Sequence, residues 1–251
     1  MTLLAVERMK LFTTRSPWWC MIVALALTVG FGALYAATLP AEFTFDVAAT
    51  QSGGQLGMMV IMVLAALAVT TEYRFGTIKA TFQAAPNRTA VMLAKSTVVT
   101  ALAFVVGEIA AFAAWGVSYL ISGNEVLALD TSQEWVQLTG LGLVYAGAAL
   151  YALAVGMLVR QSAGAISLVL VWALLVESLV QLLPRVGNDL YDWMPFAAAT
   201  RFLMQSGGAE TSMSSQLPEP PIGPWASLVY FLAIGVVLLV LGIVTVRQRD
   251  A

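Results

Sequence analysis

The sequence predicts an all-α integral membrane protein with six transmembrane helices, and three observations lead to this class. Hydrophobic residues make up 60% of the 251 residues and charged residues only 10%, against about a quarter charged in a soluble domain. Six apolar windows come close to the roughly 20 residues that a spanning helix needs. They are continuously apolar and lack the alternation of membrane β-strands. The windows lie near residues 17–38, 55–71, 97–121, 137–159, 163–183 and 225–246.

We expect one transmembrane domain over residues 1–251, because the six windows leave no room for a sizeable soluble domain. The second window is the shortest and begins at the polar and small run 51–54. A five-helix protein is therefore the main alternative.

The distribution of lysine and arginine orients these helices. With the N-terminus inside, ten of the twelve basic residues fall in cytoplasmic segments, and only Arg185 and Arg201 fall outside, in agreement with the positive-inside rule. We therefore expect a multi-pass protein of the plasma membrane with both termini in the cytoplasm. The first apolar run exceeds the core length of a signal peptide, so the first span is expected to be retained.

Residues 1–16 predict a helix that lies on the inner membrane surface, with apolar and polar side chains on opposite faces. The following Pro17 and Trp18-Trp19 mark entry into the bilayer, since indole rings favour the headgroup level. A disordered basic start is the alternative. The apolar face carries Leu4, Ala5, Met9 and Phe12, the polar face Glu7, Lys10 and Thr14, and Arg15 completes the polar residues of this interfacial helix.

A short charged stretch separates the second and third windows and predicts an amphipathic cytoplasmic helix over residues 72–85. Phe75, Ile78 and Phe82 recur at helical spacing. Pro86 ends the pattern, because proline disfavours helix in the residue before it. Two interpretations stay open: a helix that a partner protein pushes, or a solvated loop whose apolar stripe rests on the membrane. The polar side of the helix carries Glu72, Lys79 and Gln83.

Two spans carry small residues at four-residue spacing, which lets helix backbones approach closely in lipid. These rows serve either the interior of the bundle or a dimer face. They are Ala103, Gly107 and Ala111 in the third span, and Ala148, Ala152 and Gly156 in the fourth.

The external segment 184–224 precedes the last span. Its first half has aromatic anchors around 191–196 and an apolar run at 197–204 that is too short to cross a bilayer. We expect a pair of short helices in the outer leaflet there, followed by a flexible connection.

Glu108 and Glu177 are the carboxylates within spans, and an acid in a membrane helix is a functional candidate because its burial in lipid is costly. Glu108 lies near the predicted midplane, where a role in the translocation path or in gating competes with a structural hydrogen bond. Glu177 lies nearer the outer surface, where water or Arg185 is within reach.

The composition argues against chemistry by the chain itself. There is no histidine and only one cysteine, Cys20, which removes haem ligands, most zinc sites and any internal disulfide. Ala94-Lys95-Ser96 is similar to the end of a phosphate-binding loop, but Thr89 and Ala94 stand where glycines are required. We expect no catalytic, metal or cofactor site in this chain and no nucleic-acid partner.

The segments Glu7 to Trp19 and Thr71 to Thr81, the latter followed by Pro86-Asn87-Arg88, resemble permease subunits of ABC-2-type transporters of the kind found in actinobacteria. The resemblance implies that two six-span subunits pair, as a homodimer or heterodimer, and that each docks on a separate ABC ATPase that binds ATP and Mg²⁺. The residues implied to contact that ATPase, in the family's coupling helix, are Glu72, Tyr73, Arg74, Phe75 and Gly76.

Together these features predict a bilayer-embedded permease that exports an amphipathic or hydrophobic compound: a drug, a peptide antibiotic or a lipid. The alternative is a membrane immunity or scaffold protein that binds a peptide or partner without transport. An ion-coupled carrier would require inverted repeats, and the two halves of the sequence show no convincing repeat.

Overall fold

The computed structural model describes residues 2–38, 46–85, 87–123, 127–184, 186–205 and 222–249, and no strand occurs among them. The six long helices are α2 (Arg15–Thr38), α4 (Gly54–Arg74), α6 (Arg88–Ser122), α7 (Ser132–Val159), α8 (Ser162–Val171) with its continuation, and α12 (Pro224–Arg249). The short helices are α1 (Leu3–Thr13), α3 (Val47–Thr50), α5 (Thr77–Ala84), α9 (Glu177–Val180), α10 (Gly187–Tyr191) and α11 (Pro195–Gln205).

The six predicted spans are confirmed, since six of the described helices are long and apolar enough to cross a membrane. The second of them, α4, has 21 residues, which removes the five-helix alternative. α8 runs through a π-helical turn, Trp172–Val176, into α9, so that these three pieces form the fifth span.

α7 is the central helix of the bundle, and it packs against α4, α6, α8, α11 and α12. Small residues allow this close packing: a Cβ atom built on Gly107 of α6 would lie 2.7 Å from the Cα of Gly142 in α7. Both predicted rows of small residues are buried. Gly107 of the third-span row lies at the contact of α6 with α7, and Gly156 of the fourth-span row lies against α4, so both rows serve the interior of the bundle.

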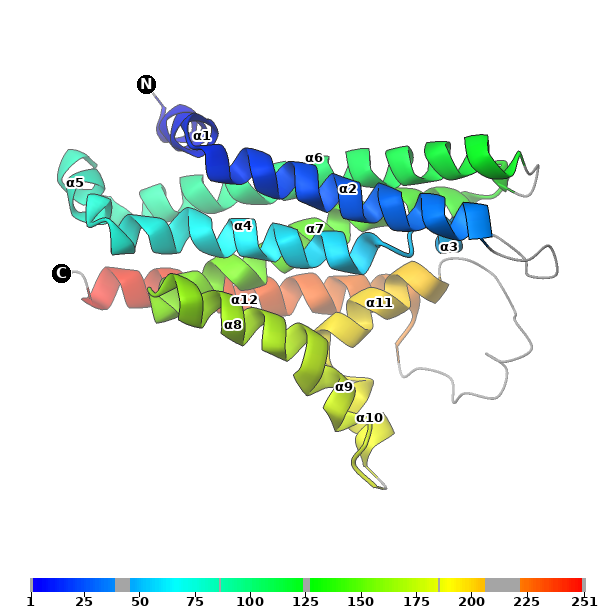
Figure 1. Cartoon of the computed structure of the whole chain (residues 1–251). Helices are drawn as coiled ribbons and strands as arrows, with labels where there is room; N and C mark the ends of the chain where they lie inside the picture. The colour runs from blue at the N-terminus through cyan, green and yellow to red at the C-terminus, as the bar shows by residue number, and fades with distance from the viewer. Residues whose placement is uncertain are drawn as a thin grey trace.

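α1 lies across the direction of α2, and Figure 1 shows it almost end-on, at the same end of the bundle as α5 and the end of α12. The chain turns at Thr14, whose backbone is extended with φ −95° and ψ 148°. The predicted interfacial helix over 1–16 is therefore shorter than expected. Arg15 belongs to α2 instead of α1 because the extended backbone at Thr14 interrupts the helix.

The predicted helix over 72–85 is divided by a turn. Glu72, Tyr73 and Arg74 complete the last turn of α4, and α5 begins only at Thr77. Gly76 between them has φ +70°, a left-handed conformation that ends a helix and favours glycine. Phe75 lies in this turn and does not join the apolar stripe of α5.

Replacing Gly76 with alanine is expected to destabilise the chain by about 1 kcal/mol, because an L side chain disfavours the left-handed conformation. No atom lies within 4 Å of the added methyl group, so the effect is purely conformational. Thermal unfolding in detergent measures it. The control is Gly116→Ala in α6, which also has open space but lies in a right-handed helix, where alanine should be neutral or stabilising. Equal effects of the two substitutions would contradict the conformational explanation.

The described part of the external segment contains the two expected short helices, α10 and α11. Arg201 of α11 donates hydrogen bonds to the carbonyl and carboxylate oxygens of Asp192, at 3.0 and 3.1 Å. This ion pair neutralises one of the two basic residues placed outside by the charge count. The other, Arg185, and the predicted flexible connection at 206–221 lie outside the described residues.

Candidate functional site

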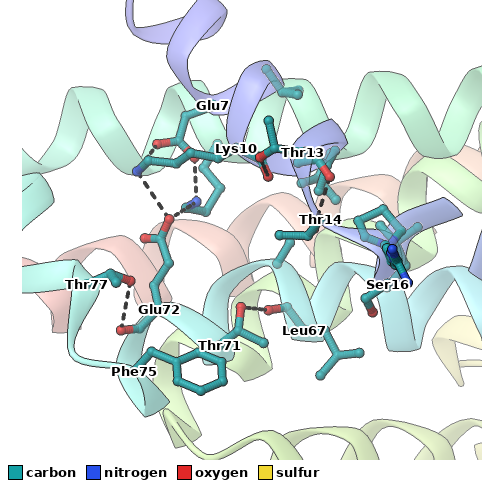
Figure 2. A pocket seen from close by; sticks show the side chains of 18 residues that line it. Glu7, Lys10, Thr13, Thr14, Ser16, Leu67, Thr71, Glu72, Phe75 and Thr77 are labelled. Carbon is teal, nitrogen blue, oxygen red and sulfur yellow. Dashed lines mark hydrogen bonds and ion pairs between the residues drawn. The ribbon is translucent and has the colours of Figure 1, made fainter.

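Four charged side chains from three helices meet at the end of the bundle where α1 lies, and Figure 2 shows the ion pairs among them. The amino group of Lys10 lies 2.9 Å from Glu7 Oε1 and 3.2 Å from Glu72 Oε1. The amino group of Lys95 lies 2.9 Å from the same Glu72 oxygen and also contacts Glu7 Oε2. We call these four residues the ion cluster. It joins α1, α4 and α6.

Three residues of the ion cluster are withdrawn from solvent, since Glu7 and Lys95 are each 4% exposed and Glu72 is 9% exposed, while Lys10 is half-buried. Buried opposite charges are tolerated because each compensates the other. Although burial by itself lowers the pKa of Lys10, hydrogen bonding and attraction from the carboxylates of Glu7 and Glu72 outweigh it and raise that pKa. Lys10 therefore stays protonated at neutral pH.

The ion cluster also connects to α5, because the amino group of Lys10 donates a hydrogen bond of 3.1 Å to Thr81 Oγ1. Ile78 of α5 is buried, while Lys79 and Gln83 on the same helix are exposed. α5 is thus held to the bundle by Ile78, by the half-buried Phe82 and by the cluster. Two of the three apolar residues of the predicted stripe face the core, whereas Phe75 is exposed.

Sequence reasoning placed Glu7 and Lys10 on a polar face opposite the apolar one and did not pair them with Lys95. The structure turns Glu7 inward, while Leu4 and Met9 of the apolar face are exposed. The position of Lys95 in the sequence could have indicated that it has a charged partner. α6 begins at Arg88, so Lys95 lies two turns inside a membrane helix, where a lysine requires a partner of opposite charge.

The turn between α4 and α5 is the most exposed part of the predicted coupling region. Phe75 is 71% exposed, and Arg74 and Gly76 are exposed beside it. The guanidinium of Arg74 lies 5.6 Å from the centre of the Phe75 ring. Tyr73 is half-buried beneath the guanidinium of Arg160, at 5.1 Å from its ring centre. Arg74, Phe75 and Gly76, here called the exposed tip, present a cationic and aromatic surface.

Glu177 lies at the opposite end of the bundle and fixes the start of α11. Its carboxylate accepts hydrogen bonds from the backbone N–H groups of Phe196 and Ala197, at 3.1 and 2.8 Å. These groups lie in the first turn of a helix, where backbone donors lack partners within the helix. The indole of Trp172 donates a third bond, at 3.1 Å. The π-helical turn aligns Trp172 with Glu177, since π-helical bonding joins residues five apart.

Glu108 lies near the middle of α6, as predicted, with its carboxyl group against Gly142 of α7. A Cβ atom on Gly142 would lie 2.2 Å from Glu108 Oε1, so the glycine provides the space that the carboxyl group occupies. Among the described residues no hydrogen-bond partner reaches this oxygen. Glu108, Glu177 and the ion cluster are therefore three separate sites. No group of three or more potential metal ligands occurs in the described part of the chain.

Residues 3–176 match the family described as ABC-2 family transporter protein. This range covers more than half of the chain and contains the ion cluster and the exposed tip. A comparison with curated proteins finds no match.

Proposed function

The chain belongs to the ABC-2 family of transporter proteins, and from this membership we propose that it is the permease subunit of an exporter of amphipathic or hydrophobic compounds. A separate ABC ATPase, which binds ATP and Mg²⁺, supplies the energy in this proposal. Two permease subunits pair across the bilayer, and both termini face the cytoplasm. The proposed cargo is the one predicted from the sequence: a drug, a peptide antibiotic or a lipid.

The observation that carries the proposal is the combination of an exposed tip with a buried ion cluster directly behind it. The tip offers a guanidinium and an aromatic ring, which are side chains enriched at protein interfaces. Glu72 lies only two residues before Arg74, but its carboxylate is buried against Lys10 and Lys95. The tip therefore contacts the ATPase, while Glu72 connects the tip to α1 and α6.

This arrangement explains how movement of the ATPase would reach the membrane helices. α4 carries the tip at its end, and charged contacts hold α1 and α6 to it at distances of 2.9 to 3.2 Å. Separating charges that are largely buried is costly. A displacement of the tip would therefore move α1, α4 and α6 as one unit, in the manner of a rigid-body transition.

The proposal is tested by replacing both Arg74 and Phe75 with alanine in the full transporter. Because both side chains are exposed, the permease should insert and fold normally, yet lose the contact that it makes with the ATPase. We expect at least about a tenfold loss of affinity between the two subunits, the effect of removing one strong contact residue. Copurification and transport into vesicles measure the outcome.

The control is Leu120→Ala, which removes an exposed side chain at the far end of α6 and should leave both readouts unchanged. Unaltered affinity in the double variant would reject the exposed tip as the docking contact. Copurification without any ATP-binding partner, together with retention of a peptide, would favour the immunity or scaffold alternative.

A further inference from the structure

A cavity of about 600 Å³ lies next to the ion cluster, enclosed by the end of α1, the start of α2, α4 and α6 (Figure 2). Its volume falls in the range of small-molecule sites, about 300 to 1,000 Å³. The proposed export mechanism does not use this space. Its lining divides into a polar end and an apolar wall.

The polar end opens to the surface between α1 and the α4–α5 turn. Thr13, Thr14 and Arg15 line the cavity on one side, Phe75 and Thr77 line it on the other, and all five are exposed. Because the sequence predicts that α1 lies on the membrane surface, we expect this opening at the depth of the lipid headgroups.

The apolar wall continues from this opening toward the middle of the bundle. Leu64, Leu67 and Ala68 of α4 face Val98 and Val99 of α6 across the cavity. Leu64 precedes Glu72 by eight residues on one helix, a distance of about 12 Å at 1.5 Å per residue. The cavity therefore matches a molecule with a polar head and the first part of a hydrocarbon chain.

One atom of the ion cluster indicates what the head must supply. Glu72 Oε1 is contacted by both Lys10 and Lys95. Its other oxygen, Oε2, is buried, and no donor among the described residues reaches it. A buried carboxylate oxygen is costly to leave without a hydrogen bond. Since Glu72 lines the cavity, a small rotation of its carboxylate would bring this oxygen to an N–H or O–H group of a bound molecule.

The charges at the site restrict the choice further. In the ion cluster Glu7 and Glu72 pair with Lys10 and Lys95, whereas Arg15 at the opening has an exposed, positively charged side chain. A phosphate group at the opening would compensate Arg15. The head of the bound molecule would thus carry a phosphate near the surface and a hydrogen-bond donor at its end.

We propose that this cavity binds a phospholipid whose headgroup ends in a hydrogen-bond donor, an ethanolamine or a glycerol headgroup, in preference to choline. The donor bonds to Glu72 Oε2, the phosphate lies beside Arg15, and the upper part of one acyl chain lies along the α4 and α6 wall. Choline ends in a trimethylammonium group and has no N–H or O–H group to offer. The assignment of this leaflet as the inner one rests on the proposed orientation, whereas binding itself does not.

The test uses the purified chain without any ATPase, in phosphatidylcholine nanodiscs that contain a small fraction of phosphatidylethanolamine or of phosphatidylglycerol with the same acyl chains. Lipid retained after extraction into detergent is measured by mass spectrometry. We expect retention of each donor lipid about tenfold over phosphatidylcholine, the effect of one hydrogen bond to a charged group. The two separate mixtures distinguish the ethanolamine from the glycerol headgroup.

Ala68→Trp fills the cavity from α4 and should abolish the preference, and Val98→Phe should do so from α6 if the tryptophan variant does not fold. The matched control is Ile22→Trp, at an exposed position of α2, which should keep the preference for donor lipids.

Equal retention of all three lipids, or an unchanged preference in a cavity-filling variant that folds, would overturn the proposal. Equally tight binding of free phosphoethanolamine or glycerol phosphate would overturn it as well, since these compounds lack the acyl chain. Because no transport is measured, the result does not depend on the proposed export activity.

Discussion

Replacing Lys95 with alanine is expected to lower the free energy of unfolding by about 3 kcal/mol, the cost of removing one partner from a buried ion pair. The amino group of Lys95 contacts both Glu7 and Glu72 and is almost completely withdrawn from solvent. Its removal leaves two buried carboxylates with Lys10 as their remaining partner in the cluster. Unfolding of the purified chain in detergent measures the loss.

The matched control is Lys79→Ala. Lys79 has the same charge and is exposed on α5, so its replacement should change stability by no more than about 0.5 kcal/mol. A double-mutant cycle between Glu7→Gln and Lys95→Met should show a coupling energy of about 1 kcal/mol or more, as found for residues in direct contact. If Lys95→Ala is as mild as Lys79→Ala, the ion cluster does not hold α1, α4 and α6 together.

The second large effect is expected for Glu177→Ala, which removes the acceptor of three hydrogen bonds, from Phe196, Ala197 and Trp172. At about 1 kcal/mol for each donor left without a partner, the loss is about 3 kcal/mol. Its structural consequence is local, because Glu177 is the acceptor that fixes the first turn of α11. We therefore expect the first part of α11 to open from the bundle more often while the six spans remain folded.

Cysteine labelling measures this opening in a Cys20→Ser background, where no native thiol is left because Cys20 is the single cysteine. Ala199→Cys lies at a buried position of α11, and Met204→Cys lies at an exposed one. The thiol at 199 should be protected when Glu177 is present and reactive in Glu177→Ala, whereas the thiol at 204 should react in both. Glu177→Gln, which keeps one acceptor oxygen, should fall between. Continued protection at 199 in Glu177→Ala would refute the anchoring role.

Much of the fold could be predicted because composition within each apolar window is a local property. A helix in lipid satisfies its own backbone hydrogen bonds, so the six windows correspond to six helices without knowledge of their neighbours. The turn that divides the predicted helix over residues 72–85 was harder to predict from the sequence. Phe75 and Ile78 fit a continuous helix by spacing, and only the backbone shows that Gly76 takes a positive φ and interrupts it.

The candidate sites were predicted as separate residues, but their partners were not. Glu177 was identified as an acid within a span, yet its partners are backbone N–H groups 19 and 20 residues further along, and such groups have no signature in a side-chain pattern. Glu7 and Lys95 are 88 residues apart. Their contact depends on how α1 crosses the bundle, which no window of sequence contains.

The amino-acid sequence by itself determined that this protein lies in the membrane as six helices, because the free energy of placing an apolar segment in lipid depends on that segment alone. The pairing of Glu7 and Glu72 with Lys95, the placement of Glu177 at the start of α11 and the cavity beside Arg15 were decided only by the tertiary structure. Hydrogen bonds and ion pairs act over a few ångströms, so they form only after packing has brought distant segments together.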